Sequence, residues 1–168
     1  MHMRIALAFL AVILILPLHA ANIVAEPFPP ARFTSLYLER DDKGTSTVIQ
    51  MNGDTVLYKV TTGNKVVESA TVTPSPDDWF TFIQGLNAAK VYKWAPKYEY
   101  PGEGGSWVID LAMDDRTFAS EGANEYPKDG AEDQPNASPG SGPSLAFQLF
   151  WHAALGLVGK DTPAAPVK

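Results

Sequence analysis

Residues 47–73 read TVIQMNGDTVLYKVTTGNKVVESATVT, and this stretch decides the fold. The Asn-Gly pair at 52–53 separates two runs rich in β-branched residues. Such a pair is typical of a type I′ hairpin turn, because both central positions of that turn need a positive φ. The Gly-Asn pair at 63–64 then precedes a third run, 65–73, in which apolar and polar residues alternate. The stretch therefore predicts three antiparallel strands joined by tight turns.

A fourth strand is predicted immediately upstream. Residues 32–40, RFTSLYLER, alternate between apolar and polar side chains, and the sequence DDKG at 41–44 supplies a turn. Before this strand, residues 26–31 form a Pro-rich leader, since each proline restricts itself and its preceding residue to extended backbone. The chain from 32 to 73 is therefore predicted to form a four-stranded antiparallel meander.

The spacing of apolar residues changes to that of a helix after the meander. Ser75 can cap the helix, Pro76 suits its first position, and the acids Asp77 and Asp78 complement the positive end of its dipole. Apolar residues then recur at helical spacing on one face: Trp79, Phe82, Ile83, Leu86 and Ala89. The pattern predicts an amphipathic helix packed on the meander.

A second hairpin and a last helix complete the predicted elements. Residues 107–113 and 116–120 have the pattern of paired strands, and residues 144–158 are apolar around much of a helix. Together these elements predict an α+β domain over residues 32–159. Its antiparallel sheet has about six strands, the meander plus the hairpin, and two helices pack on one face.

Two further segments are expected to lack regular structure. Residues 128–142 are predicted to form a flexible acidic loop, because they are rich in Pro, Gly, Ser and acids and have no apolar period. Residues 160–168 are predicted to be a disordered Ala/Pro tail. The 168-residue length suits one domain, so neither segment is taken as a domain boundary.

Composition excludes several functional classes. The chain has a formal net charge of −6, which disfavours nucleic acid as a partner, because phosphate binding needs a basic surface. It has no cysteine, and this excludes disulfides, thiolate catalysis, iron–sulfur clusters and cysteine-ligated zinc. The lipid anchor of a bacterial lipoprotein is excluded for the same reason. The core must therefore stabilise the fold without covalent help.

Residues 1–25, MHMRIALAFLAVILILPLHAANIVA, have the layout of a secretory signal peptide. Arg4 precedes an apolar run over residues 5–16, which is too short to cross the ~30 Å hydrocarbon core of a membrane as a helix. Small residues follow, and the candidate cleavage positions are after Ala20 and after Ala25. We therefore expect an exported protein, periplasmic or secreted, that meets the membrane only through this segment. The alternative is a protein anchored by an uncleaved N-terminal segment.

The sequence offers few groups for catalysis. His152 is the one histidine after the signal segment, and it lies on a predicted amphipathic helix. No serine stands in a nucleophile-elbow context. The acids at 129–133 lack the alternating spacing of a calcium loop, and the glycines at 102–105 lead into a strand rather than a helix, unlike a phosphate-binding loop. We therefore predict no catalytic residue, no metal site and no cofactor.

An aromatic segment, residues 91–107, is the most unusual part of the chain and reads VYKWAPKYEYPGEGGSW. Aromatic side chains in a Pro- and Gly-containing connection can form a stacking platform for a sugar, a peptide or a cation. They can equally pack over the sheet as core, and the sequence leaves both roles open. The candidate binding residues are Trp94, Tyr98, Tyr100 and Trp107 from this segment, with Asn124 and Tyr126 beyond it.

Three short motifs occur together in the second half of the chain. W-x-x-F lies on the first predicted helix, a W…Y…W pattern spans the aromatic segment, and SEGANEYP at 120–127 has the form S-x-G-x-N-x-Y-P. In these motifs the chain resembles small uncharacterised bacterial proteins, a likeness that covers residues 75–127 and the last helix. It departs from them where Glu103-Gly104 replaces Asp-Gly and where residues 128–142 form an insertion. The resemblance implies no reaction.

The SEGANEYP segment can be explained as a tight connection. Gly122 is expected to relieve a positive φ, and the Asn124 side chain to hydrogen-bond nearby backbone. The alternative is that Asn124 and Tyr126 face a ligand.

These features favour an exported, non-enzymatic domain that binds a protein, a peptide or an envelope polymer through the aromatic segment and its neighbouring loops. The alternative is a small carboxylate-dependent hydrolase of the cell envelope that uses acids such as Asp110 and Glu121. A third arrangement is an interaction domain tethered to the membrane, with the Pro-rich leader as spacer. Sheet-plus-helix scaffolds host enzymes and binding domains alike, so the fold does not choose between these functions.

The signal-peptide interpretation predicts the mass of the exported protein. Residues 1–20 or 1–25 are expected to be missing, because signal peptidase cuts after small residues. Intact-mass spectrometry of the protein recovered from the periplasm or medium of a bacterial host measures this. A full-length mass would contradict the interpretation and favour the anchored alternative.

Overall fold

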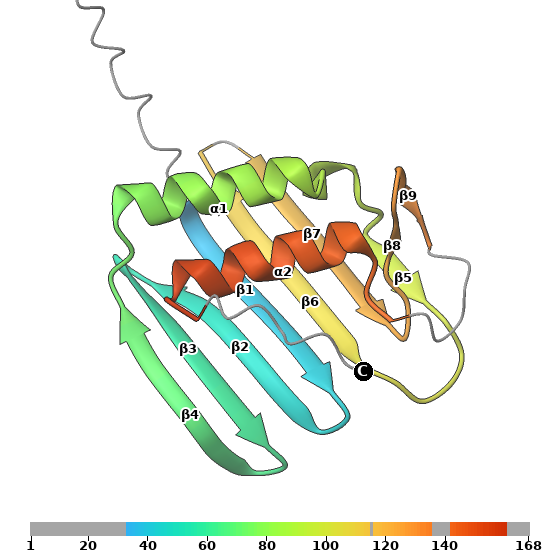
Figure 1. Cartoon of the computed structure of the whole chain (residues 1–168), viewed down its shortest axis with the longest axis horizontal. Coiled ribbons are helices and arrows are strands. Elements are labelled where there is room, and N and C mark those ends of the chain that lie inside the picture. The colour runs from blue at the N-terminus through green and yellow to red at the C-terminus, as the bar shows by residue number, and fades with distance from the viewer. Residues whose placement is uncertain (1–32, 115, 136–141, 161–168) are drawn as a thin grey trace, which may run out of the picture.

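The computed structural model describes residues 33–114, 116–135 and 142–160 (Figure 1). The predicted signal segment and the Pro-rich leader lie outside the described residues. So do residues 136–141 of the predicted loop and residues 161–168 of the predicted tail. Within the described part, the chain forms an α+β fold with a large sheet, a small sheet and two α-helices.

The four-stranded meander predicted from the sequence is present. It consists of β1 (Phe33–Asp42), β2 (Thr45–Asn52), β3 (Thr55–Thr62) and β4 (Lys65–Val72). Each strand pairs antiparallel with the next. Alternate side chains of β1 to β3 point toward the helices and are the more buried ones, which is the two-residue period that the sequence displays.

The hairpin turns differ in detail from the prediction. Asn52 pairs with Thr55, so the loop consists of Gly53 and Asp54, and of these two only Gly53 has a positive φ, of 61°. This is the pattern of a type II′ turn rather than a type I′ turn. The type I′ pattern, with two positive φ values, occurs at residues 43–44 instead. Both turn types suit the twist of paired strands. The strands therefore pair as predicted, although the turn type differs from the prediction.

The large sheet has seven strands in the order β4-β3-β2-β1-β6-β7-β5. β6 (Ser106–Met113) and β7 (Arg116–Ala123) form the predicted second hairpin, and β6 also pairs antiparallel with β1. β5 (Lys97–Glu99) runs parallel to β7 at the edge, so the sheet is mixed. The prediction of about six antiparallel strands misses β5, because three residues are too few to display a strand period.

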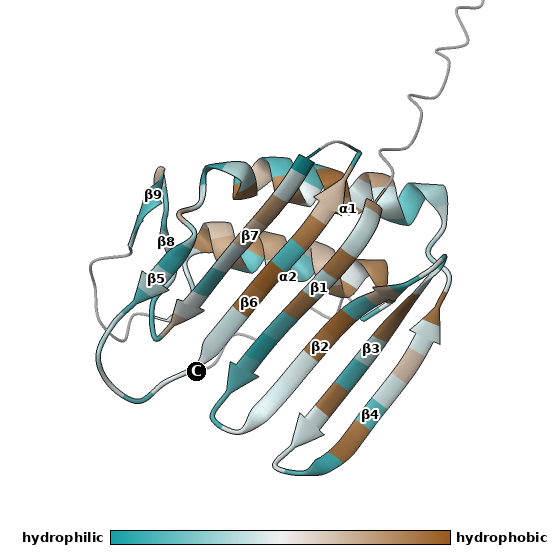
Figure 2. Cartoon of the chain, turned by 180° about the vertical axis from the view of Figure 1, so that it is seen from behind, coloured by the Kyte–Doolittle hydropathy of each residue, from teal (hydrophilic) through white to brown (hydrophobic). Residues whose placement is uncertain are grey.

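Both helices lie on one face of the large sheet, and no element of the described residues covers its other face (Figures 1 and 2). α1 (Pro76–Ala88) begins as predicted, since the Ser75 hydroxyl accepts from the Asp78 amide at 3.2 Å and the Asp78 carboxylate accepts from the Ser75 amide at 2.7 Å. A short 3₁₀ turn, η1 (Val91–Lys93), follows α1, and α2 (Leu145–Leu157) is the last element. In the described part of the chain, no helix is long and apolar enough to cross a membrane.

An aromatic cluster joins α2 to the sheet. Phe147 on α2 is fully buried, and its ring centroid lies 5.2 Å from that of Trp107, 4.8 Å from that of Tyr126 and 6.0 Å from that of Trp94. One turn further on, the Phe150 centroid lies 5.5 Å from that of Trp94. Aromatic pairs of this kind contribute about 0.5–1.5 kcal/mol each beyond their buried area. The last helix is therefore part of the core rather than an appendage.

A small hairpin occupies part of the segment predicted to be a flexible loop. β8 (Pro127–Lys128) and β9 (Ala131–Pro135) pair antiparallel. One of the acids that suggested solvation is bonded instead: the Asp129 carboxylate accepts from the amides of Leu145 and Ala146 at 3.1 and 2.7 Å. These amides belong to the first turn of α2, where the helix itself offers no partner. The contact joins segments 16 residues apart, so local sequence patterns do not display it.

A second contact fixes the hairpin on its other side. Lys90 Nζ lies 3.1 Å from Oε1 of Glu132, which is buried, and the Gly130 amide donates to the same oxygen at 3.2 Å. Burial raises the pKa of Glu132, but hydrogen bonds from backbone amides and from the Lys90 ammonium outweigh it and hold the pKa below its usual value. The carboxylate therefore stays charged and ties the hairpin to the connection after α1.

The Asp129 contact predicts a difference in stability. In Asp129→Ala, the Leu145 and Ala146 amides lose their partner, so the free energy of unfolding is expected to fall by about 1–2 kcal/mol. Urea unfolding followed by circular dichroism measures this. Asp133→Ala is the matched control, because Asp133 is an exposed acid on the same hairpin. Equal losses in the two variants would show that Asp129 does not cap α2.

Candidate binding site

Three of the five aromatic side chains in the aromatic segment belong to the core. Trp94, Tyr98 and Trp107 have exposed fractions of 5 %, 2 % and 1 %, and Tyr126 is 9 % exposed. Tyr100 is different, because 41 % of it is exposed. Of the two roles that the sequence leaves open, core packing therefore describes Trp94, Tyr98 and Trp107, which present no ring face to solvent.

The polar atoms of these buried rings are also used inside the fold. Trp94 Nε1 donates to the Ala89 carbonyl at 3.0 Å. The Tyr98 hydroxyl donates to the Glu132 carbonyl and accepts from the Ala95 amide at 2.6 Å. Burial is the largest cause that raises the pKa of Tyr98 to about 12, although the Ala95 amide lowers it. Tyr98 is therefore a neutral phenol that links the aromatic segment to the β8–β9 hairpin.

Trp107 lies against Gly122, its partner in the β6–β7 ladder. A Cβ atom on Gly122 would lie 2.2 Å from Trp107 Nε1 and 2.7 Å from the Glu125 carbonyl oxygen, which accepts from that same Nε1 at 2.9 Å. The expected positive φ at Gly122 is not observed, so this glycine is required for space and not for backbone conformation. In the same strand, the Ser120 hydroxyl donates to the Ala95 carbonyl at 2.6 Å.

Asn124 ties the end of β7 to the loop before β6. Its φ is 58°, its amide donates to the Gly105 carbonyl at 2.8 Å, and its Nδ2 donates to the carbonyls of Tyr100 and Gly102 at 3.2 and 2.5 Å. A Cβ atom on Gly104 would lie 2.1 Å from Asn124 Oδ1. The Asn124 side chain therefore bonds to backbone as predicted, but its partners lie 22 and 24 residues away in the chain rather than in the same segment. SEGANEYP acts chiefly as a structural connection that fixes the loop 100–105.

The fixed loop forms one wall of a hollow of about 410 Å³ at this end of the sheet, which we call the loop hollow. Three of the six predicted residues line it, namely Tyr100, Asn124 and Tyr126. Charged residues line it as well: Asp42, Lys43, Glu103 and Glu125. Trp94, Tyr98 and Trp107 are not part of its lining, although they support the elements that form it.

The β1–β2 turn contributes to this hollow, which was not predicted from the sequence. Asp42 and Lys43 reach it because the turn lies against Gly105, where a Cβ atom would be 2.6 Å from the Asp41 carbonyl oxygen. The adjacent glycines at 104–105 were the available signal for such a close approach. Nothing in the sequence identified the turn as the segment that approaches them.

One of the charged lining residues, Asp42, takes part in an ion pair. Arg40 Nη2 lies 2.6 Å from Asp42 Oδ2, and the guanidinium carbon lies 5.9 Å from the ring centroids of Phe147 and Trp151. Burial is the main cause that raises the pKa of Tyr126, with Arg40 lowering it and Asp42 raising it. Tyr126 is therefore protonated at neutral pH and offers a neutral hydroxyl. The arrangement can hold a polar ligand by hydrogen bonds and by contact with the exposed Tyr100 ring.

The two acids of the hydrolase alternative lie away from this hollow. Asp110 is exposed on the uncovered face of the sheet, opposite Ala119 in the ladder. Glu121 borders a shallow depression of about 200 Å³ on β5–β7, where its Oε1 lies 3.9 Å from Lys97 Nζ. Paired carboxylates that cleave a glycosidic bond flank it from two sides. These two acids occupy neighbouring strands of one open surface instead.

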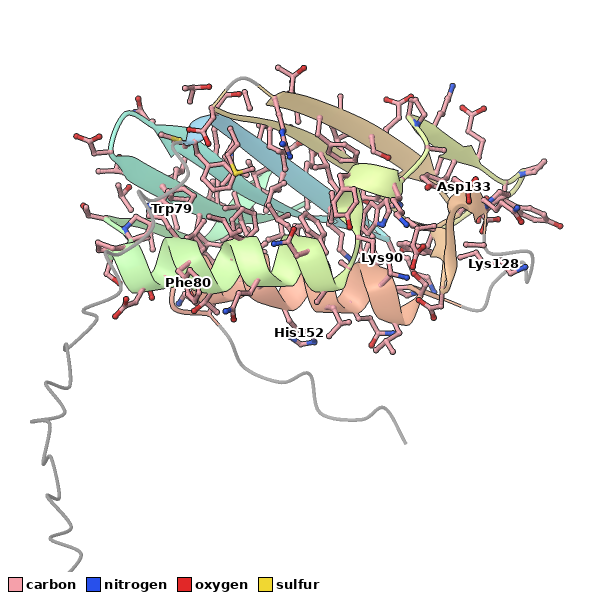
Figure 3. The ribbon with its side chains drawn as sticks, turned by 90° about the horizontal axis from the view of Figure 1, so that it is seen from above. Trp79, Phe80, Lys90, Lys128, Asp133 and His152 are labelled. Carbon is pink, nitrogen blue, oxygen red and sulfur yellow. The ribbon has the colours of Figure 1, made fainter. Side chains whose placement is uncertain are left out.

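The remaining candidates for catalysis and metal binding are His152 and the acidic side chains. His152 lies on the side of α2 that faces away from the sheet, far from the uncovered face (Figure 3). Among residues 33–114, 116–135 and 142–160, no group of three His, Asp or Glu side chains is arranged to hold a metal ion.

Comparisons with known proteins add no family assignment. A scan against protein-family models gives no match, and a search of curated proteins gives none either. The function is therefore argued from the geometry of the described residues.

The contact between Trp107 and Gly122 predicts a strong effect of one added methyl group. Gly122→Ala is expected to lower the free energy of unfolding by about 1–3 kcal/mol, because the indole and the Glu125 carbonyl must both move. Urea unfolding measures the loss. In a Trp107→Phe background the same substitution should cost less, since the smaller ring leaves room. Equal costs in the two backgrounds would contradict the steric explanation.

Proposed function

We propose that this chain is an exported, non-enzymatic binding domain whose loop hollow takes a polar segment of an envelope polymer. One observation carries the proposal: Tyr100, Asn124 and Tyr126 meet carboxylates and an ammonium group in one concavity. A glycan-containing polymer suits this chemistry best, because it offers ring faces to an aromatic side chain and hydroxyl groups to charged ones. The export component of the proposal rests on the sequence of residues 1–25.

Tyr100 is the expected stacking residue. It is the exposed aromatic side chain of the loop hollow, whereas Tyr126 presents little surface. Its loop is held by Asn124 Nδ2, which donates to the carbonyls of Tyr100 itself and of Gly102. A loop that is fixed before binding loses little conformational entropy when a ligand arrives, and this favours affinity. The bonds of Asn124 thus support binding without direct contact with the ligand.

Glu103 and Lys43 are the expected hydrogen-bonding groups. Both are exposed residues of the hollow, and no ion pair joins either to another described residue. Asp42 is less available, because Arg40 already pairs with it. A carboxylate accepts strong hydrogen bonds from hydroxyl and ammonium groups, and Lys43 can donate to carboxylates of a peptide-bearing polymer. The hollow therefore suits a neutral or zwitterionic segment.

The hydrolase alternative gains no support from the positions of its two acids. General acid–base cleavage needs carboxylates directed at one bond within a concave site. Asp110 lies on an open face and Glu121 borders only a shallow depression. We therefore retain the non-enzymatic function and use the hydrolase as the contrasting outcome of the test.

Binding to envelope polymer tests the proposal directly. The purified chain is incubated with isolated cell-wall sacculi and with soluble glycan fragments, and the bound fraction is measured by co-sedimentation and by calorimetry. Tyr100→Ala is expected to weaken binding about tenfold, the loss of roughly one aromatic contact. Glu103→Gln should weaken it less, because one acceptor oxygen remains.

Phe80→Ala is the matched control, since Phe80 is an exposed aromatic residue that lies outside the hollow. It should bind like the parent chain. Equal binding by Tyr100→Ala and the parent would contradict the site. Release of soluble fragments from sacculi that Asp110→Ala or Glu121→Ala abolishes would contradict the non-enzymatic function.

A further inference from the structure

The outer edge of β7 is only partly covered. β5 pairs with residues 121–123 of β7, and the edge above them has no neighbouring strand among the described residues (Figure 1). On the side of β5, the Glu121 amide donates to the Pro96 carbonyl and the Ala123 carbonyl accepts from the Tyr100 amide, each at 3.0 Å. Along a strand, the N–H and C=O groups of successive residues point alternately to its two edges. Thr117 and Ala119 therefore present their N–H and C=O groups to the same, uncovered edge.

An apolar groove of about 510 Å³ lies beside this uncovered edge, between β6–β7 and the end of α1. Its apolar lining comes from α1, η1, Met113 and the paired residues Leu111 and Phe118. Thr117 from the edge itself also borders it. Tyr92, which is 65 % exposed, also lines it. β5 pairs only with residues 121–123 of β7 and contributes no residue to the groove. A strand edge and an apolar groove are thus side by side.

A cation stands at one end of the groove. Arg116 is the first residue of β7, is exposed and lines the groove on the side of the sheet that faces α1. No ion pair joins it to another residue in the described part of the chain. A guanidinium matches the planar geometry of a carboxylate with two parallel hydrogen bonds.

We infer that the β7 edge and this groove bind the C-terminal residues of an extended peptide. The peptide adds as a strand antiparallel to β7 and exchanges backbone hydrogen bonds with Thr117 and Ala119. Antiparallel pairing brings its C-terminal carboxylate to Arg116, whereas parallel pairing would take that carboxylate to the other end, beside β5. One peptide therefore contacts all three features of the site: the strand edge, the apolar groove and the Arg116 guanidinium.

The register also specifies the peptide side chains. Residues opposite each other in an antiparallel pair share a face of the sheet. The peptide residues opposite Phe118 and Arg116 therefore point toward the groove, and the one opposite Thr117 points to the uncovered face. The site accordingly selects apolar residues at the last and third-from-last positions of a chain with a free carboxylate. A fatty acid could fill the groove, but it would leave the amides and carbonyls of Thr117 and Ala119 unused.

This inference does not rest on the loop hollow. The groove lies at the N-terminal end of β7, beside α1, whereas Asn124 and the hollow lie just beyond its C-terminal end. The two sites share no lining residue. Either proposal can therefore fail alone.

Fluorescence polarisation with a labelled hexapeptide, Gly-Gly-Ser-Leu-Thr-Leu, tests the peptide site on the purified chain. The free acid is expected to bind at least fivefold more tightly than the C-terminal amide, since the amide loses the charge partner of Arg116. Replacing the two leucines by serine should abolish the signal. Equal binding of acid and amide would overturn the role of Arg116 and with it the proposed orientation.

Two variants separate the components of the site. Arg116→Gln should reduce binding of the free acid to the level of the amide and leave amide binding unchanged. Ala119→Pro removes an N–H at this edge that pairs with no other strand among the described residues, so the chain should stay folded. Binding of both the free acid and the amide should become about tenfold weaker. Should that variant unfold, Arg116→Gln still decides the outcome.

Lys59→Gln, a cation removed from distant β3, and Tyr100→Ala, from the loop hollow, are the matched controls and should bind like the parent. Undiminished binding by Ala119→Pro would overturn strand addition. Displacement of the peptide by decanoate, combined with Ala119→Pro binding as tightly as the parent, would identify an acyl-chain groove instead and overturn the peptide assignment.

Discussion

The position of Trp107 over Gly122 is the constraint on which the second half of the structure depends. The indole fills the space that a side chain on Gly122 would occupy, and its Nε1 bonds to the Glu125 carbonyl at 2.9 Å. Phe147 then packs on the same indole, so α2 has one defined place on the sheet. Because Glu125 directly follows Asn124, the bond also sets where the chain leaves β7. The packing of α2 and the geometry of the loop hollow therefore both depend on this one contact.

Local patterns predicted the meander and α1 well, and they failed where distant segments decide the outcome. The capping residues Ser75 and Asp78 act within one turn, so their signal is complete in the sequence. β5 is ordered by its pairing with β7, and the β8–β9 hairpin by the bonds of Asp129 to α2. Neither interaction has a local signature. Acids that serve as helix caps from a distance look the same in sequence as acids that face water.

The candidate site was predicted in part for the same reason. The aromatic composition of residues 91–107 marked the right region, but composition does not distinguish rings that pack inward from rings that face out. Tyr98 and Tyr100 have the same parity in the segment, yet one is buried beneath the β8–β9 hairpin and the other lies beyond the end of β5. Asp42 and Lys43 line the loop hollow from the β1–β2 turn, which the sequence predicted only as a connection within the meander. Which side chains belong to the core and which to the site depends on contacts with distant segments, and residue type alone does not reveal these contacts.

The strand order has a consequence for how the chain folds. β1 lies between β2, its neighbour in the sequence, and β6, whose paired residues lie about 70 positions further along. The meander closes through short turns, whereas β6 can dock only after the loss of entropy of a long intervening loop. Until then one edge of β1 stays unpaired, and such an edge is a template for pairing between chains. Aggregation is therefore a hazard of the interval before β6 docks, and a holding chaperone that covers β1 would act at that stage.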